Sequence, residues 1–319
     1  MTAGPRLRLG ISTCLTGERT RYDAGHKYDP CLLEILGPYA EWVPVCPEVE
    51  VGLPVPREPM RLEGPPDSPR LMTHHTRQDL TERMGTWAKR RVGELGALGL
   101  DGFILKSRSP SCGLFAVPVY DDQGCQTGEG RGLFAAELVR QLPLLPVEEE
   151  GRLYAPDRRD NFIERAFAWR RLRGLLQEGP TPGALVAFHT AHKMVLLAHS
   201  PEAYHRLGRL VAGAGTADPQ ALAAGYAGLF MQALQVPATV GRHVNVLQHL
   251  LGFLGGDLTP GDKAELLEAI EDYRQGRLPL LVPTTLLKYH LGRAAVSDWV
   301  GQQVYLNPDP AELMLRYHA

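Results

Sequence analysis

The sequence predicts two domains: an α/β domain with a mostly parallel sheet over residues 1–150, and an all-α domain over residues 151–319. Short apolar runs alternate with helical patterns in the first half, which is typical of strands joined by crossover helices. From about Pro156 onward the apolar residues recur with the helical period of 3.6. A polar segment with proline on both sides, LPVEEEGRLYAPDRRD, separates the two patterns. The length of 319 residues also favours two domains, because single cores stop growing at about 250 residues.

The elements of the first half follow from these runs. Strands are expected at 7–13, 40–46 and 101–107, with a further candidate at 115–121. A short helix is expected over 31–40, and a long amphipathic helix over 79–99. The stretch 52–69 is rich in proline and glycine, which predicts a loop or lid.

The second half reads as helices separated by glycine and proline. The expected helical segments are 161–177, 184–200, 201–214, 219–254, 260–276 and 283–292.

Composition narrows the class of protein. The net charge is −2 and neither half is strongly basic, so an RNA partner would have to bind a local patch. No apolar run is long enough to cross a bilayer, and the first residues lack the apolar stretch of a secretory signal. We therefore expect a cytoplasmic protein without a membrane partner. We also expect no DNA partner.

Three of the five cysteines share a position at strand ends. Cys14, Cys46 and Cys112 each follow an apolar run, whereas Cys31 begins a helix and Cys125 lies in a turn. The carboxyl ends of parallel strands lie at one edge of a sheet, so the first three are expected to meet in one crevice. An odd number of thinly spread cysteines does not make a disulfide framework.

Three thiolates with a vacant fourth position can hold either a [4Fe–4S] cluster with one open iron or a zinc ion with a bound water. The spacing does not choose between them, and three separately buried cysteines are an equal alternative on the residues alone. The lack of tight spacing such as C-x-x-C argues against zinc ribbons and ferredoxin-type carriers.

Polar residues accompany these cysteines. Glu48 follows Cys46 by two positions, and Ser109 and Ser111 precede Cys112. A carboxylate beside a metal can move protons and hydroxyls can position a ligand, although helix-start or capping roles explain the same residues. The cations Lys106, Arg108 and Arg57 either neutralise an anionic group or are simply solvated.

Three motifs in order, GISTCLTGERTRYDAGHK, VPVCPEVEVGLPVPRE and ILKSRSPSCG, resemble those of the thiouracil desulfidase family. The resemblance implies that Cys14, Cys46 and Cys112 hold an oxygen-sensitive [4Fe–4S] cluster whose fourth iron takes the substrate's sulfur. It further implies that Glu48 is the acid/base carboxylate and that Ser109 is the catalytic serine, which we expect to hold the base in position.

The loop after the first cysteine contains Arg21, Tyr22 and His26. A substrate-facing loop is expected there, but the sequence assigns these residues no role. His26 is a candidate fourth ligand, ranked below the open site because desulfuration needs a vacancy.

The second half, with FHTAHKMVLLAHSPEAYHRLGRLVA and GRHVNVLQHLLGFLG, resembles the helical domain of two-domain members of the family. Those members are similar to enzymes that remove sulfur from 4-thiouridine in tRNA, and their helical domain is suspected of binding RNA. RNA recognition uses cations for phosphate and aromatic rings for stacking. We therefore predict RNA contacts from five cations: Arg170, Arg171, Lys193, Arg242 and Lys288.

Other interpretations of the helical half remain. The arginines of 158–173 interleave with Phe162, Phe167 and Trp169, but an ordinary amphipathic helix with an aromatic core explains that pattern better for an isolated helix. The histidines of 189–199 and 243–249 lack the carboxylate of H-E-x-x-H, so interhelical hydrogen bonds or RNA contacts are favoured over zinc.

Three functions follow from the sequence. The first is a cluster-dependent, non-redox desulfidase acting on 4-thiouridine in tRNA. The second is a desulfidase of free thiouracil whose helical domain serves dimerisation. The third is a non-catalytic sensor that binds a cluster or zinc.

Overall fold

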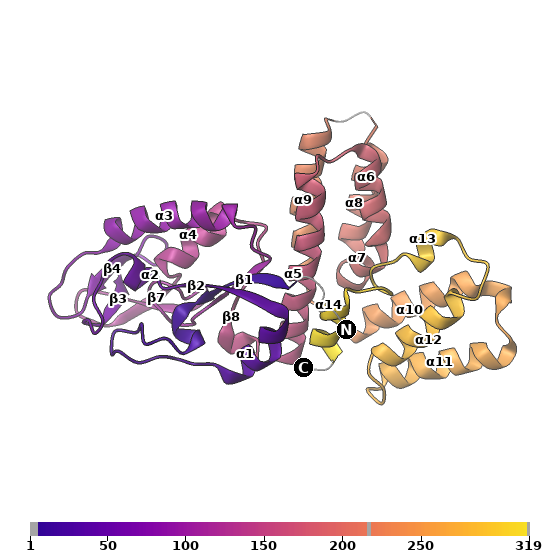
Figure 1. The fold of residues 1–319 in the computed structure, drawn as a ribbon, viewed down its shortest axis with the longest axis horizontal. Coiled ribbons are helices and arrows are strands. Elements are labelled where there is room, and N and C mark those ends of the chain that lie inside the picture. Colours follow the sequence, from indigo (N-terminus) through magenta and orange to yellow (C-terminus); the bar gives the residue numbers. More distant parts are fainter. Residues whose placement is uncertain (1–5, 216–217, 318–319) are drawn as a thin grey trace. The chain divides into compact units, whose positions relative to one another are not determined.

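The computed structural model describes residues 6–215 and 218–317. The chain divides into two compact units between Trp169 and Arg170. The first contains both β-sheets and the second is helical (Figure 1).

The first sheet is fully parallel. It has the order β2 (Ala40–Val45), β1 (Leu7–Ser12), β5 (Gly102–Leu105) and β8 (Val147–Glu149). The central strands β1 and β5 are almost entirely buried, as expected for strands covered on both faces. The predicted α/β class with a mostly parallel sheet is confirmed.

A second, mixed sheet was not predicted. Its order is β4 (Arg70–Thr73), β3 (Met60–Glu63), β6 (Val117–Tyr120) and β7 (Gln126–Gly130), with only β3 and β6 parallel. The prediction of a loop throughout 52–69 is therefore wrong over β3. Proline and glycine flank this four-residue strand. They predict a loop more strongly than the weak alternation of apolar residues within it predicts a strand.

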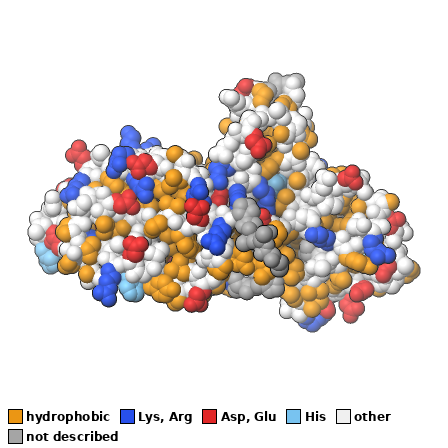
Figure 2. Space-filling view, viewed as in Figure 1, with side chains coloured by type: hydrophobic (Ala, Val, Ile, Leu, Met, Phe, Trp, Pro, Cys, Tyr) orange, Lys and Arg blue, Asp and Glu red, His pale blue; other side chains and the backbone are white. Residues whose placement is uncertain are grey.

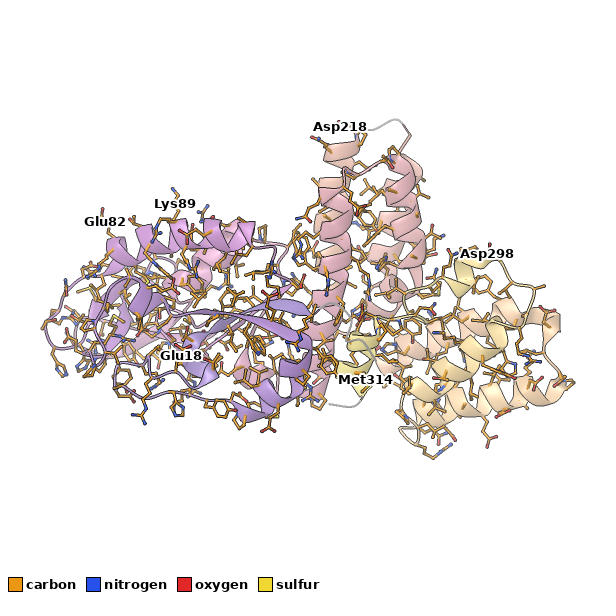
Figure 3. The ribbon with its side chains drawn as sticks, in the orientation of Figure 1. Glu18, Glu82, Lys89, Asp218, Asp298 and Met314 are labelled. Atoms are coloured by element: carbon orange, nitrogen blue, oxygen red, sulfur yellow. The ribbon has the colours of Figure 1, made fainter. Side chains whose placement is uncertain are left out.

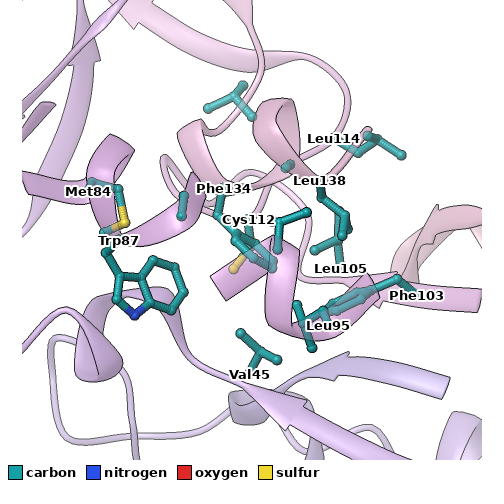
Figure 4. Close-up of a cluster of buried hydrophobic side chains, with 14 of the residues drawn as sticks. Val45, Met84, Trp87, Leu95, Phe103, Leu105, Cys112, Leu114, Phe134 and Leu138 are labelled. Atoms are coloured by element: carbon teal, nitrogen blue, oxygen red, sulfur yellow. The ribbon is translucent and has the colours of Figure 1, made fainter. Parts of the chain in front are cut away.

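Two helices pack together in the first unit, α3 (Thr81–Ala97) and α4 (Leu133–Gln141). Their buried side chains join those of the parallel sheet in one core that includes Trp87, Phe103 and Phe134 (Figure 4). The charged side chains of Glu82 and Lys89 point outward from α3 (Figure 3). This amphipathic pattern is the reason the long helix was predictable.

The short helices of the first unit are α1 (Pro30–Leu36), α2 (Pro47–Glu50) and the 3-10 turns η1 (Thr13–Thr16), η2 (Gly37–Tyr39) and η3 (Glu150–Arg152). Helix α5 (Pro156–Gln177) contributes its first part to the first unit and its last part to the second.

The prediction of an all-helical second half is confirmed. Its elements are α6 (Pro182–Ala191), α7 (Lys193–His199), α8 (Pro201–Ala212), α9 (Pro219–Leu234), α10 (Val240–Leu254), η4 (Gly255–Asp257), α11 (Pro260–Arg274), α12 (Leu281–Leu291), α13 (Asp298–Gly301) and α14 (Pro310–Tyr317). Side-chain oxygens of Thr181, Ser200, Asp218, Thr239 and Thr259 cap five of these helices at their N-termini. Among the described residues, no helix has both the length and the hydropathy needed to cross a bilayer.

Candidate functional site

A cavity of about 440 Å³ opens at the carboxyl ends of β1, β2 and β5. The three strands are neighbours in the parallel sheet, so the segments that follow them are brought together. Cys14, Cys46 and Cys112 all line this cavity, as their positions at strand ends predicted.

Each of these cysteines lies in the segment that follows its strand. Cys14 lies in η1 directly after β1, and Cys46 is the residue before the first turn of α2. Cys112 lies in the loop between β5 and β6, where its backbone N–H donates to the Ser109 hydroxyl over 3.1 Å. Cys31 and Cys125 are exposed and do not line the cavity.

The three thiols lie in a poorly solvated environment. Burial raises the pKa of Cys14 to about 11, with a further increase from the neighbouring Cys46, while Lys106 and Arg21 act in the opposite direction. Burial also raises the pKa values of Cys46 and Cys112. The free thiols therefore stay protonated at neutral pH, and metal binding would displace protons because the thiolate is the ligand.

The donor set suits a metal–sulfur group. Three unpaired cysteine sulfurs face one cavity, and soft thiolates are the ligands that iron–sulfur clusters take. Within the described ranges, no group of three or more His, Cys, Asp or Glu side chains is arranged to hold a metal ion directly. In a cluster each cysteine binds a different iron, so that the three sulfurs need not converge on one ion.

Glu48 also lines the cavity, and both of its carboxylate oxygens have partners. The Oε1 atom accepts a hydrogen bond of 2.7 Å from the Ser111 hydroxyl. The Oε2 atom accepts from the Arg57 guanidinium through Nε at 3.0 Å and through Nη2. A carboxylate is therefore present beside the cysteines, as predicted.

Ser109 does not bond to Glu48 in this structure. Its hydroxyl accepts from the backbone N–H groups of Ser111 and Cys112 and lies 3.0 Å from the Ser111 hydroxyl. We expected Ser109 itself to hold the base in position, but in this structure Ser111, two residues later, makes the hydrogen bond to Glu48. Proximity in sequence could not separate the two serines, because both precede Cys112.

The loop that carries these serines rests on the first turn of α4. The Ser111 carbonyl accepts hydrogen bonds from Phe134 and Ala135, and the Gly132 N–H donates to the Gly113 carbonyl. A Cβ atom added at Gly132 would lie 2.6 Å from the carbonyl carbon and oxygen of Ser111. Gly132 is therefore required for close approach of two backbones, a role that the sequence analysis missed.

The lining of the cavity also contains cations and an aromatic ring. Arg21 and Tyr22 line it, and the Arg21 guanidinium lies 5.3 Å from the Tyr22 ring centre. Lys106 pairs with Glu150, whereas Arg108 lines the cavity, is exposed and has a left-handed backbone with φ of 57°. His26 is exposed and is not among the lining residues.

The structure gives several predicted RNA-binding cations internal contacts. Arg171 pairs with Glu312, and Arg242 donates to the His199 carbonyl over 2.6 Å. Lys193 lies 5.1 Å from the Trp299 ring centre. Arg170 is half-buried and Lys288 is exposed. On the face shown in Figure 2, acidic side chains lie among the basic ones.

Two of the three aromatic residues of α5 are buried, and the third is partly buried. Phe162 and Phe167 are buried, and the Trp169 indole N–H donates to the Leu100 carbonyl over 3.0 Å. The core interpretation of this helix therefore holds for Phe162 and Phe167, and Trp169 packs against the core.

The histidines of the helical unit bond between elements. His189 contacts the Tyr226 hydroxyl, His199 the Val236 carbonyl and His243 the Tyr305 hydroxyl. The predicted interhelical hydrogen bond is present for His189, whereas Val236 and Tyr305 lie in segments between helices.

Comparison with known proteins covers both halves of the chain. A family model described as 2-thiouracil desulfurase matches residues 9–150, and one described as a protein of unknown function (DUF1722) matches residues 193–310. The chain is 32% identical over 160 residues to "Uncharacterized protein YbgA" of Escherichia coli (strain K12). The aligned region covers 50% of this chain and 94% of that protein. A solved structure described as a [4Fe-4S]-dependent thiouracil desulfidase, TudS, is 31% identical to this chain. The match covers 47% of this chain and 94% of the chain of that structure, with a TM-score of 0.38.

Proposed function

Because this chain belongs to the 2-thiouracil desulfurase family, with a DUF1722 domain after the desulfurase domain, we propose that it is a [4Fe–4S]-dependent, non-redox desulfidase of thiolated pyrimidines. The observation that carries this proposal is the meeting of Cys14, Cys46, Cys112 and Glu48 at one cavity. Cys14, Cys46 and Cys112 would hold the cluster. When bound, the cluster would supply one open iron, a Lewis acid that polarises the thiocarbonyl group.

The reaction is a hydrolysis. Water attacks the ring carbon, the carbon–sulfur bond breaks, and a carbonyl oxygen replaces the sulfur, which leaves as hydrogen sulfide. Glu48 would take the proton from the attacking water and return it as the bond breaks. No net electron transfer occurs, so the chain needs no electron donor.

We propose 4-thiouridine in tRNA as the substrate. Arg108 supports this choice because it is an exposed cation at the cavity that forms no ion pair within the described part of the chain, and such a guanidinium suits a phosphate. Tyr22 offers a ring at the same opening, on which an unstacked base can lie. The exposed Lys288 remains a proposed backbone contact in the helical unit.

Free thiouracil is the second candidate. It is favoured by the description of the matching family, which names 2-thiouracil. A free base needs no phosphate contact, so the helical unit would then serve another purpose.

The test begins with anaerobic purification and measurement of iron and acid-labile sulfide per chain. The protein is then incubated with tRNA that contains 4-thiouridine, and separately with free thiouracil, while loss of the thiolated base is followed. Cluster-dependent loss from tRNA supports the first substrate. Turnover of thiouracil alone supports the second, and a full cluster with no turnover of either refutes the enzyme.

Glu48→Ala tests the acid/base assignment. We expect the iron content to stay at the wild-type level while turnover falls by about 10²–10⁴-fold, the contribution typical of a positioned acid or base. Wild-type turnover in this variant would make the assignment wrong.

A further inference from the structure

A hydrogen-bonded chain of four side chains runs along one wall of the cavity. It begins at Ser109, continues through Ser111 to Glu48, and ends at Arg57. The chain joins the loop after β5, the turn after β2 and the segment before β3. These three segments are distant in sequence.

The direction of the hydrogen bonds is fixed by the number of protons. The single hydroxyl proton of Ser111 is donated to Glu48, so Ser111 is the acceptor in its bond with Ser109. The Ser109 oxygen is itself held by the backbone N–H groups of Ser111 and Cys112. Ser109 therefore reaches the carboxylate only through Ser111.

Arg57 holds the opposite side of the carboxylate. Its side chain is 5% exposed and that of Glu48 is 15% exposed, so the pair is shielded from water. The same guanidinium donates to the carbonyls of Thr20 at 2.9 Å and Pro54 at 3.2 Å, which leaves it little freedom to rotate. A planar guanidinium held at several points is a rigid support for a carboxylate.

We propose that Ser111 and Arg57 are positioning residues that fix the carboxylate of Glu48 toward the cavity, and that Ser109 acts on this carboxylate through Ser111. The inference rests on the proposed function, because it concerns the residue that serves there as acid/base. Fixing a carboxylate at both oxygens removes its rotational freedom before the substrate arrives, and misplacement of a catalytic group by about 1 Å can cost about 10²-fold in rate.

The main experiment compares Ser111→Ala with a matched serine. Ser111→Ala removes one hydroxyl without adding volume. We expect kcat to fall by about 10–100-fold while KM changes by less than about 2-fold and the iron content is unchanged. Ser68→Ala is the control, because Ser68 is exposed and does not line the cavity, so loss of its hydroxyl should leave kcat near the wild-type value.

A double-variant cycle separates positioning from an independent role. In a Glu48→Gln background, measured by single-turnover kinetics, Ser111→Ala should cause no further loss, because its effect passes through the carboxylate. An equal loss in both backgrounds would overturn the inference. Arg57→Lys keeps the charge but not the planar group, and we expect it to lower kcat with little change in KM.

The position of the Glu48 carboxylate can be measured without any assay of turnover. Crystal structures of the wild type and of Ser111→Ala should show the Glu48 side chain displaced or disordered in the variant only. If Glu48→Gln abolishes turnover while Ser111→Ala keeps both the wild-type kcat and the wild-type carboxylate position, this inference is wrong and the proposed function stands. If Glu48→Gln retains full turnover, both are wrong.

Discussion

The close approach of Gly132 to the Ser111 backbone predicts that Gly132→Ala lowers the free energy of unfolding of the first unit. The added Cβ would lie 2.6 Å from two backbone atoms of Ser111, whereas ordinary van der Waals contact begins at 3.4 Å. The loop over 109–113 must therefore retreat by about 0.8 Å, the difference between these distances. Gly132 has φ of −60° and ψ of 145°, so alanine fits the local conformation, and the penalty comes from space alone.

The magnitude follows from two contributions. Overpacking in a tight site costs about 1–3 kcal/mol. Retreat of the loop also weakens the bonds from Phe134 and Ala135 to the Ser111 carbonyl, and a hydrogen bond contributes about 1 kcal/mol. We expect the free energy of unfolding of the first unit to fall by about 2–4 kcal/mol. Displacement of the loop that carries Ser109, Ser111 and Cys112 should also reduce turnover by about 10²-fold.

Urea denaturation followed by tryptophan fluorescence measures the stability of the first unit, because three of the four tryptophans lie there. Gly85→Ala is the control. Gly85 is exposed inside α3 with no atom within 4 Å of the added Cβ, so this variant should gain about 0.5–1 kcal/mol. A Gly132→Ala protein with the wild-type urea midpoint and full iron content would refute the reasoning.

Two further predictions concern cysteines and histidines. Cys31→Ser and Cys125→Ser should retain the wild-type iron content, because both side chains are exposed outside the cavity, whereas Cys112→Ser should lose most of it; iron per chain after anaerobic reconstitution decides. Burial lowers the pKa of His189 to about 4 and that of His192 to about 3, so between pH 6.5 and 4 the unfolded chain binds more protons than the folded one. The contribution of the two neutral histidines to the free energy of unfolding is then complete above pH 6.5. It decreases on acidification, by about 2 kcal/mol per histidine at pH 5. In urea titrations from pH 7 to 5, His192→Leu should show a shallower loss than the wild type, and parallel curves would contradict the assignment.

Much of the first unit could be predicted because its main signals are local. The runs before Cys14 and Cys46 are apolar enough to identify as strands, and the parallel arrangement then places both cysteines at one edge. Helix α3 was predictable from its amphipathic period, and its observed bounds lie within two residues of those expected.

The second sheet and the wall of the cavity were not predictable in the same way. Strand β3 is short, and its identity depends on pairing with β6, more than fifty residues away. The partners of Glu48 also come from distant segments, and no local pattern distinguishes Ser111 from Ser109. In α5, the interleaved arginines suggested a nucleic-acid surface, but burial of Phe162 and Phe167 depends on tertiary packing.

The placement of the cavity at three separate strand ends has a consequence for how the protein is made. Cys112 follows Cys14 by 98 residues, which takes about 5–20 s of translation at 5–20 residues per second. During that interval the nascent chain contains Cys14, and later Cys46, but not yet Cys112. Strand β5, which leads to Cys112, pairs with β1, so the three sulfurs can face one another only after this long-range pairing forms. Acquisition of the proposed cluster would thereby be coupled to completion of the sheet, and a truncated or misfolded chain would keep its free thiols open to oxidation.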